Sequence, residues 1–252
     1  MTAPWKSALL GMVGGAAIAL ALVLAVAALG WLPHSATRDG RAIRAYLLSH
    51  PELIVDMQVA LQEQEAESTQ REQQAALLKI GMKPFFDPRI AFLTGPRLAK
   101  TTFVEFFDYN CPYCRASLPA VKKYFEAHKN DTRFSFIEFP IKGPNSIVAA
   151  RASLAARKQP DRYIAFHFAL MNEDAIVDED IVFADAVKAG LDVAKLKADM
   201  TDPEIDRAID ISHKLALRAK IDGTPTFLFN GQLHPGVVSE GELKDMMKAK
   251  PT

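Results

Sequence analysis

The chain has 252 residues, 30 of them basic and 30 acidic, so its formal net charge is zero. A balanced chain without a long run of one sign lacks the basic surface that nucleic acids require, and we expect no nucleic-acid partner. It has no Gly-rich phosphate loop, no Ser-His-Asp order and no obvious catalytic carboxylate pair, and we expect no cofactor.

The N-terminal segment is strongly apolar. Ser7 to Leu32 contains no charged residue and is long enough, as a helix, to cross a bilayer core of about 30 Å. Trp5 and Trp31 stand at its two ends, where aromatic rings favour the membrane interfaces. We interpret residues 1–34 as an uncleaved transmembrane anchor. A signal peptide is the alternative, because Ala25-Val26-Ala27 fits a cleavage site.

Residues 35–84 read as a helical stalk. The pattern predicts a short helix over 41–49 and a long one from Glu52 to Ile80, ended by Gly81 and Pro84. Near the start of the long helix, one stripe is apolar at three-to-four spacing: Leu53, Ile54, Met57 and Leu61. A helix without its own core needs a partner, so we expect self-association. A simple spacer is the alternative, because residues 62–74 are almost entirely polar.

The only two cysteines form the motif Cys111-Pro112-Tyr113-Cys114. A strand is predicted over 101–108 and a helix over 115–128, so the motif lies at a strand-to-helix turn. With Cys111 at the N-cap and Pro112 at the first helical position, the helix dipole favours a Cys111 thiolate. We predict an exposed Cys111 that attacks substrates and a deeper Cys114 that resolves the mixed disulfide.

Two other interpretations of the cysteines compete with a redox pair. Two cysteines can simply be inert, or they can belong to a metal knuckle. A structural zinc site needs four ligands, and the six histidines contain no pair at short spacing, so we expect no metal site. The redox interpretation is therefore favoured.

The rest of the chain predicts further strands and helices. Strands are expected over 133–140, 226–230 and 233–238, with a turn at Asn230-Gly231 between the last two. Helical periodicity dominates residues 146–220, and Asp178, Asp192 and Thr201 are candidate helix starts. Glu105 interrupts the apolar strand six residues before Cys111.

The stretch Phe-Val-Glu-Phe-Phe-Asp-Tyr-Asn-Cys-Pro-Tyr-Cys, together with Gly-Thr-Pro-Thr-Phe at 223–227, resembles the DsbA-like thiol:disulfide oxidoreductases. The resemblance implies an α/β protein over residues 85–252, with a thioredoxin fold and an inserted helical domain at about 146–220. It implies a cis Pro225 beside the active cysteines, and main-chain hydrogen bonds from Thr224 to a substrate. Pro112 and Tyr113 complete the expected substrate-binding residues.

By the same resemblance, Glu105 is a buried acid that shuttles the proton of Cys114. A carboxylate on an edge or a twisted end of the strand is the alternative interpretation. The segment from Ile43 to Ile54 resembles the oligomerisation stalk of ScsC-like proteins, a DsbA-related group linked to copper tolerance. Some members form trimers and act as disulfide isomerases, which implies a homo-trimer here.

We therefore expect a periplasmic thiol:disulfide oxidoreductase, anchored in the inner membrane, that acts on cysteine-containing proteins and exchanges electrons with a membrane redox partner. Oxidation and isomerisation both remain open. The alternative from another class is a copper-handling protein that binds Cu(I) through the two thiolates. The positive-inside rule opposes a periplasmic catalytic domain, because Lys6 alone precedes the apolar segment while Arg38, Arg41 and Arg44 follow it. A periplasmic catalytic domain is favoured by the short N-terminal tail, which resembles the start of a secreted chain, and by the oxidising role of such cysteines.

Overall fold

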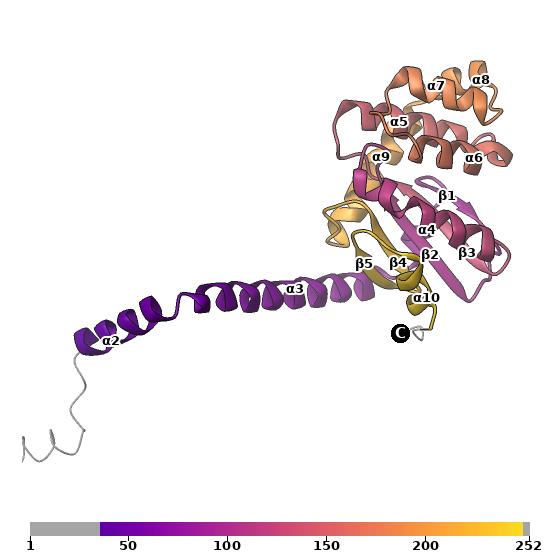
Figure 1. The fold of residues 1–252 in the computed structure, drawn as a ribbon. Coiled ribbons are helices and arrows are strands. Elements are labelled where there is room, and N and C mark those ends of the chain that lie inside the picture. Colours follow the sequence, from indigo (N-terminus) through magenta and orange to yellow (C-terminus); the bar gives the residue numbers. More distant parts are fainter. Residues whose placement is uncertain (1–35, 249–252) are drawn as a thin grey trace, which may run out of the picture. The chain divides into compact units, whose positions relative to one another are not determined.

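The computed structural model describes residues 36–248, which are coloured in Figure 1. It divides the chain into two compact units, residues 1–66 and residues 67–252. The predicted membrane anchor at 1–34 lies outside the described residues and stays a prediction. Among the helices described, none combines the length and apolar character needed to cross a membrane.

The described part of the first unit is helical. Helix α2 (Ala36–Ser49) begins five residues before the predicted start, and helix α3 (Glu52–Ile80) confirms the predicted bounds. Pro51 separates the two helices, and His50 Nδ1 lies 3.0 Å from Glu52 Oε1 at the start of α3. Large apolar side chains remain exposed along this unit, among them Ile43, Tyr46, Ile54, Met57 and Leu61. The described part of this unit therefore has little core of its own.

A five-stranded sheet forms the centre of the second unit (Figure 1). Its strands are β1 (Ala91–Thr94), β2 (Thr101–Phe107), β3 (Thr132–Glu138), β4 (Thr226–Phe229) and β5 (Gln232–Pro235), in the order β1-β3-β2-β4-β5. Strands β2 and β3 run parallel, and the other pairs are antiparallel. With the helices around it, this sheet is a thioredoxin-like α/β fold.

Five helices fill the segment between β3 and β4. They are α5 (Pro144–Ala156), α6 (Pro160–Met171), α7 (Glu179–Lys188), α8 (Val193–Asp199) and α9 (Pro203–Arg218). Asp178 and Asp192 cap α7 and α8 as predicted, because each carboxylate accepts a backbone N–H of the first turn. The start predicted at Thr201 is wrong by one residue. Asp202 caps α9, whereas the Thr201 hydroxyl donates to the carbonyl of Ala198.

The central strand β2 is covered on both faces, which explains its nearly continuous apolar sequence. On one face, Phe103 stacks on Tyr124 of helix α4 (Pro112–His128). On the other, Phe106 meets Phe85 of the short 3-10 helix η1 (Lys83–Phe86) edge to face. Helix α10 (Glu240–Lys248) packs beside α4. The loop that follows β2 therefore begins from a strand that is packed on both faces.

Residues 67–80 of α3 belong to the second unit. Leu77 is buried there, and Gln73 Nε2 donates to the carbonyl oxygen of Lys220 at 2.8 Å. Gly81 ends the helix with a positive φ of 70°, a conformation that glycine adopts without steric cost. The chain then enters η1 and β1, two short elements that the sequence pattern does not predict.

Candidate active site

The turn between β2 and α4 carries the cysteine motif. Cys111 is the N-cap of α4 with extended backbone angles, and Pro112 is at the first helical position, as predicted. The carbonyl of Cys111 accepts the backbone N–H groups of Cys114 and Arg115 at 3.1 and 3.2 Å. The sulfur of Cys111 lies at the positive end of the helix dipole, and the N–H groups of Tyr113 and Cys114 in the first turn lower the pKa of this thiol. The turn therefore favours negative charge on this atom.

A loop far away in the sequence meets this turn. The Cys111 sulfur lies 3.1 Å from the carbonyl oxygen of Thr224, and the Thr224–Pro225 peptide bond is cis. Strand β4 holds the loop in place, because Thr226 pairs with Phe106 of β2 and the carbonyl of Pro225 accepts the N–H of Gly236 at 2.9 Å. The fold thus brings together Cys111, Thr224 and Pro225, which the sequence predicted to share one site.

The two sulfurs have opposite acidities. The pKa of Cys111 falls to about 5, chiefly because the Cys114 thiol donates a hydrogen bond to its thiolate. The Thr224 side chain and the N–H groups of Tyr113 and Cys114 also lower this pKa. Burial raises the pKa of Cys114 far above its usual value, with the hydrogen bond to Cys111 and the charge of Glu105 adding to the rise. At neutral pH, Cys111 is a thiolate and Cys114 a thiol.

The expected exposure of Cys111 is wrong. Both cysteines are free thiols, and the side chain of Cys111 is as fully buried as that of Cys114. The reason is tertiary packing, because the sulfur lies against the Thr224 main chain and does not project into solvent. Between the cysteines, Pro112 and Tyr113 are both exposed, and Tyr113 is 61% exposed.

Glu105 lies inside the domain. Its side chain is buried, its Oε2 atom has no hydrogen-bond partner among the described residues, and burial raises its pKa to about 8. Its effect on the pKa of Cys114 shows that the carboxyl is close enough to interact with that thiol. The alternative, a carboxylate on an edge or a twisted end of the strand, does not fit, because β2 is a central strand and Glu105 is buried. A proton carrier needs this kind of position and acidity.

A buried carboxylate that the sequence analysis treated only as the strand end organises the turn. Asp108 accepts four hydrogen bonds, at 2.7 to 2.8 Å, from the N–H groups of Asn110, Ile141 and Lys142 and from the Ser146 hydroxyl. It thereby fixes the start of the cysteine loop against the β3–α5 connection. An Asp directly after a strand and two residues before an Asn is a signal for such a turn.

The helical insert is attached to the cysteine loop by two further side chains. Asn110 accepts the N–H of Val177 at 2.7 Å and donates to its carbonyl at 3.2 Å. Arg115 donates to the carbonyls of Tyr109 and Ala175 at 3.0 and 2.7 Å. The bonds to Ala175 and Val177 span 60 and 67 residues of sequence, so no local pattern could have revealed them. They hold the exposed Ile176 near the motif.

A second buried acid lies on the same sheet face. In the parallel register, Glu105 pairs with Phe136 and Glu138 pairs with Phe107, so the two carboxyls are diagonal neighbours. Burial raises the pKa of Glu138 well above its usual value. Nearby, the Tyr109 hydroxyl donates to Ser153 at 2.8 Å and lies 2.9 Å from His167 Nδ1. These polar groups are buried, and burial disfavours a charge on Glu138. Within the described residues, no group of three or more His, Cys, Asp or Glu side chains is arranged to hold a metal ion.

The fold and this site define a thioredoxin-fold protein with a redox-active dithiol. The sequence matches the DSBA-like thioredoxin domain over residues 102–248 and the copper resistance protein ScsC N-terminal domain over residues 40–67. The chain belongs to the DSBA-like thioredoxin domain family and is a thiol:disulfide oxidoreductase.

Solved structures agree with this assignment. A thioredoxin-like oxidoreductase from Silicibacter pomeroyi is 40% identical, with a TM-score of 0.61 over 66% of this chain and 95% of that one. A linker-deletion variant of Proteus mirabilis ScsC is 26% identical, with a TM-score of 0.64 over 86% of this chain and 95% of that one. The second match extends well beyond the catalytic domain.

Curated relatives are more distant. Disulfide bond formation protein D of Bacillus subtilis is 27% identical over 60% of this chain and 72% of its own length. The Na(+)/H(+) antiporter NhaA of Herminiimonas arsenicoxydans is 28% identical over 64% of this chain. The chain spans only about a quarter of that antiporter's length, as it does for the other antiporters that it matches.

Proposed function

We propose that this protein exchanges disulfides with cysteine-containing client proteins, with Cys111 as the attacked and attacking sulfur and Cys114 as the resolving one. The observation that carries the proposal is the contrast between the two thiols at one helix start. Cys111 has a pKa of about 5 beside the Thr224 carbonyl, whereas the pKa of Cys114 is strongly raised by burial. A good leaving and entering thiol needs such a lowered pKa.

Oxidation of a client takes two exchange steps. A client thiolate attacks the Cys111 sulfur of the oxidised protein, the bond between the two cysteines breaks, and Cys114 leaves as a thiolate that takes a proton. Glu105, with a pKa of about 8, holds a proton at neutral pH and supplies it. A second client thiolate then attacks the client sulfur of the mixed disulfide, and Cys111 leaves as a stable thiolate. The client gains a disulfide, and the protein is left reduced.

Reduction of a client disulfide, the reverse reaction, uses the same groups. The Cys111 thiolate attacks a client disulfide and releases one client thiolate. Glu105 in its carboxylate form takes the proton of Cys114, whose thiolate then attacks Cys111 and releases the second client thiolate. Thr224 and Pro225 line the entry to the sulfur, and the exposed Tyr113 provides apolar contact for the client. These four steps need no cofactor.

The stalk supports assembly of several copies, and with it isomerisation. Ile54, Met57 and Leu61 are each more than half exposed on α3, and Leu53 is partly buried. Burial of four such side chains would contribute on the order of 6 to 12 kcal/mol per chain before ordering costs. The similarity to ScsC over residues 40–67 falls on this segment. We therefore propose a trimer that holds a wrongly paired client between active sites.

The same chemistry supports an oxidising compartment. A disulfide of this kind operates where thiols are not kept reduced, so we propose a periplasmic domain held at the inner membrane by residues 1–34 and reoxidised or reduced by a membrane partner.

Refolding assays test the proposal directly. The full chain, purified in detergent, is mixed with either a reduced or a scrambled disulfide protein, and recovery of native client activity is followed. Recovery of both clients that requires Cys111 supports an isomerase, and recovery of the reduced client alone supports an oxidase. Equal recovery by Cys111→Ala and the unmodified chain would contradict disulfide exchange by this site.

A copper-handling role is the second candidate, because the two thiols lie side by side and thiolates are good Cu(I) ligands. The region similar to the copper resistance protein contains neither cysteine. Tight Cu(I) binding that depends on both cysteines, with no refolding activity, would favour this role over exchange.

A further inference from the structure

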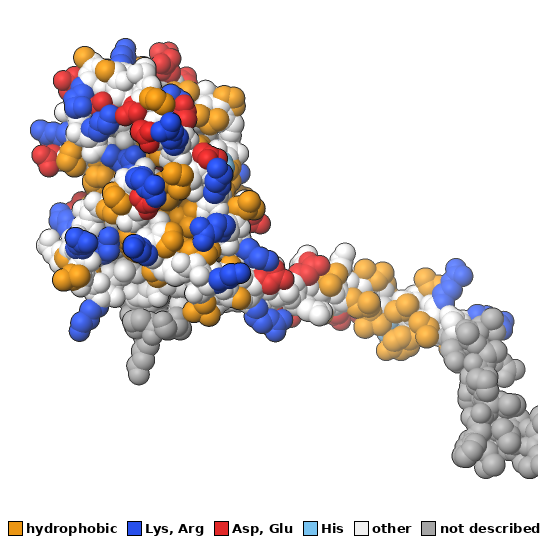
Figure 2. Space-filling model, turned by 180° about the vertical axis from the view of Figure 1, so that it is seen from behind, with side chains coloured by type: hydrophobic (Ala, Val, Ile, Leu, Met, Phe, Trp, Pro, Cys, Tyr) orange, Lys and Arg blue, Asp and Glu red, His pale blue; other side chains and the backbone are white. Residues whose placement is uncertain are grey.

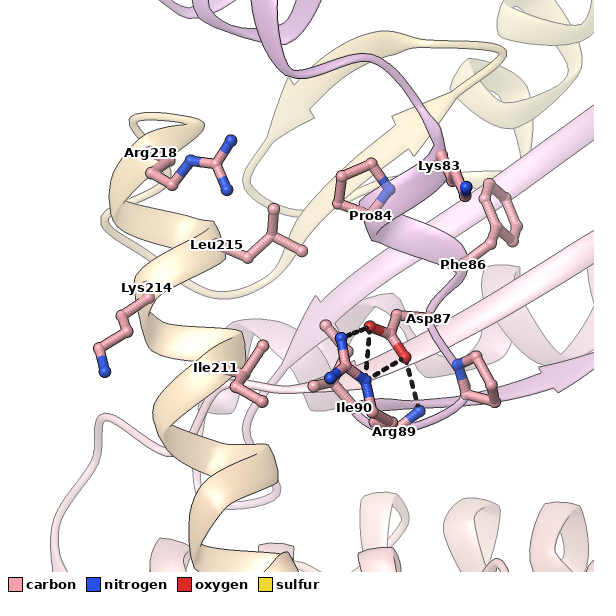
Figure 3. A pocket seen from close by; sticks show the side chains of 11 residues that line it. Lys83, Pro84, Phe86, Asp87, Arg89, Ile90, Ile211, Lys214, Leu215 and Arg218 are labelled. Atoms are coloured by element: carbon pink, nitrogen blue, oxygen red, sulfur yellow. Dashed lines mark hydrogen bonds and ion pairs between the residues drawn. The ribbon is translucent and has the colours of Figure 1, made fainter.

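A groove lies on the sheet face opposite α4. It has a volume of about 740 Å³ and runs between η1 with the residues that follow it and one side of α9 (Figure 3). Ile211, Leu215 and Arg218 recur at helical spacing on α9, so one face of this helix forms one wall. Pro84 and Phe86 contribute to the other wall. The floor is therefore apolar.

The charges around this groove are unbalanced. Its lining contains four basic side chains and one acidic side chain, although the whole chain is neutral. Two of the basic groups are already paired, since Arg89 binds Asp87 at 2.6 Å and Lys214 binds Asp210 at 2.5 Å. Lys83 and Arg218 are exposed and make no ion pair with any described residue. They supply the charge available to a partner.

The two available cations stand on opposite walls. Figure 3 shows Lys83 on η1 and Arg218 on α9 near one end of the groove, with Pro84 and Leu215 between them, and the Asp87–Arg89 pair further along. Figure 2 shows this side of the domain, where Lys and Arg side chains surround hydrophobic ones. A carboxylate placed between Lys83 and Arg218 would be held from both sides, next to an apolar floor.

The basic character continues beyond Phe86. A neighbouring hollow of about 450 Å³ is lined by Phe86, Arg97 and Arg133, and the Arg133 guanidinium lies 4.4 Å from the centre of the Phe86 ring. The hollow has no acidic side chain in its lining. Apolar surface and positive charge therefore alternate along this face.

We propose that the groove binds an acidic segment of a client polypeptide, one in which a carboxylate side chain is followed by apolar side chains. The carboxylate lies between Lys83 and Arg218, and the apolar side chains pack on Pro84, Ile211 and Leu215. The choice of a polypeptide rests on the proposed function, which brings client chains to this domain. A flat bilayer surface does not match the site, because Ile90 and Leu215 lie at the bottom of the groove and are almost fully covered.

Such a site would give the enzyme a second contact with its client, away from the cysteines. A client held there stays bound while a disulfide at Cys111 opens and closes. Acidic, partly apolar segments would be preferred over basic ones, since a basic segment would face unpaired like charges.

Fluorescent peptides without cysteine test this site separately from disulfide exchange. Three short peptides are compared by anisotropy on the full chain in detergent: one acidic and apolar, one with Lys replacing each acidic residue, and one with Ser replacing each apolar residue. We expect the first to bind at least about tenfold more tightly than the others, and to weaken as salt is raised.

Two double charge-reversal variants and one single variant show where the peptide binds. Lys83→Glu with Arg218→Glu should abolish the preference for the acidic peptide. Lys122→Glu with Arg162→Glu, on α4 and α6 across the sheet, removes the same charge and should leave binding unchanged. Arg218→Glu alone serves as a milder variant, expected to have an intermediate effect. All four sites are exposed, and folding of each protein is checked by circular dichroism.

The outcomes separate this inference from the proposed function. Loss of peptide binding in the groove variant, with oxidation of a short dithiol peptide intact, supports the site. Equal losses in the groove and control variants would overturn it, as would displacement of the peptide by dodecanoate or anionic vesicles at lower concentration than by unlabelled peptide. Failure of dithiol oxidation in the unmodified chain would refute the proposed function and leave the binding result standing.

Discussion

The sulfur of Cys111 lies 3.1 Å from the carbonyl oxygen of Thr224, although the two residues are 113 positions apart. This contact places the reactive sulfur against the main chain just before Pro225. It also covers the sulfur, and small changes in this loop will alter both its reactivity and its access.

Removal of Cys114 should raise the pKa of Cys111. The hydrogen bond from the Cys114 thiol is the largest cause of the lowered value, so Cys114→Ala should move the thiolate transition from about pH 5 towards its usual range. Thiolate absorbance at 240 nm, measured during a pH titration, records the change. Cys111→Ala provides the baseline, and an unchanged midpoint in Cys114→Ala would show that the helix N-terminus alone sets the acidity.

The reduced protein should gain stability from Cys111 as the pH rises. Its folded pKa of about 5 is below the unfolded value, so the contribution is complete above the unfolded pKa of about 8.5 and is lost as the pH falls through 5. The difference in unfolding free energy between the reduced chain and Cys111→Ala should therefore grow from pH 5 to pH 8.5. Urea unfolding at several pH values measures it, and a constant difference would contradict the assigned thiolate.

Glu105 should have the opposite effect on stability. Its folded pKa of about 8 is above the unfolded value, so the folded state keeps a proton that the unfolded state has lost, and stability falls as the pH rises from about 4.5 to 8. Glu105→Gln should remove a slope of about 1.4 kcal/mol per pH unit in this window.

The same variant should slow resolution at Cys114. Stopped-flow decay of a mixed disulfide should be at least about tenfold slower in Glu105→Gln, which corresponds to about 1.4 kcal/mol in the barrier. Equal decay rates in the unmodified chain and in Glu105→Gln would show that Glu105 has a purely structural role. Glu63→Gln, on the exposed part of α3, is a matched control.

The stalk should determine the oligomeric state. Leu53→Glu with Met57→Glu introduces charges on the apolar stripe of α3, and the expected trimer should become a monomer. Light scattering at tens of micromolar measures the mass, with Glu63→Lys with Glu65→Lys on the polar part of α3 as the control. Isomerisation of a scrambled client should weaken, whereas oxidation of a dithiol peptide should stay intact. A monomeric unmodified chain would leave a simple oxidase as the better interpretation.

Local patterns were sufficient for the elements around the cysteines. The apolar run of β2, the proline after Cys111 and the acidic caps of α7 and α8 each act within a few residues, so the sequence predicts them well. The bounds of α3 were predicted for the same reason, because a proline precedes it and a glycine follows it.

Contacts between distant segments were not predictable from such patterns. The burial of Cys111 depends on the loop at Thr224, and the hydrogen bonds of Asp108 reach the segment at Ile141 to Ser146. Strand β1 has only four residues, too few to show a periodicity that separates it from a loop. The basic groove needs η1 and α9 side by side, which only the tertiary fold produces.

The most direct test of the mechanism is to ask which cysteine reacts, and how its rate depends on pH. Cys111→Ala and Cys114→Ala are each mixed with a symmetrical peptide disulfide, and the adduct is followed by mass spectrometry from pH 4 to pH 9. We predict an adduct at Cys111 in Cys114→Ala, at a rate that levels off above the pKa of that thiol, and almost none at Cys114 in Cys111→Ala. A faster adduct at Cys114, or a Cys111 rate that still rises tenfold per pH unit at pH 9, would contradict the account.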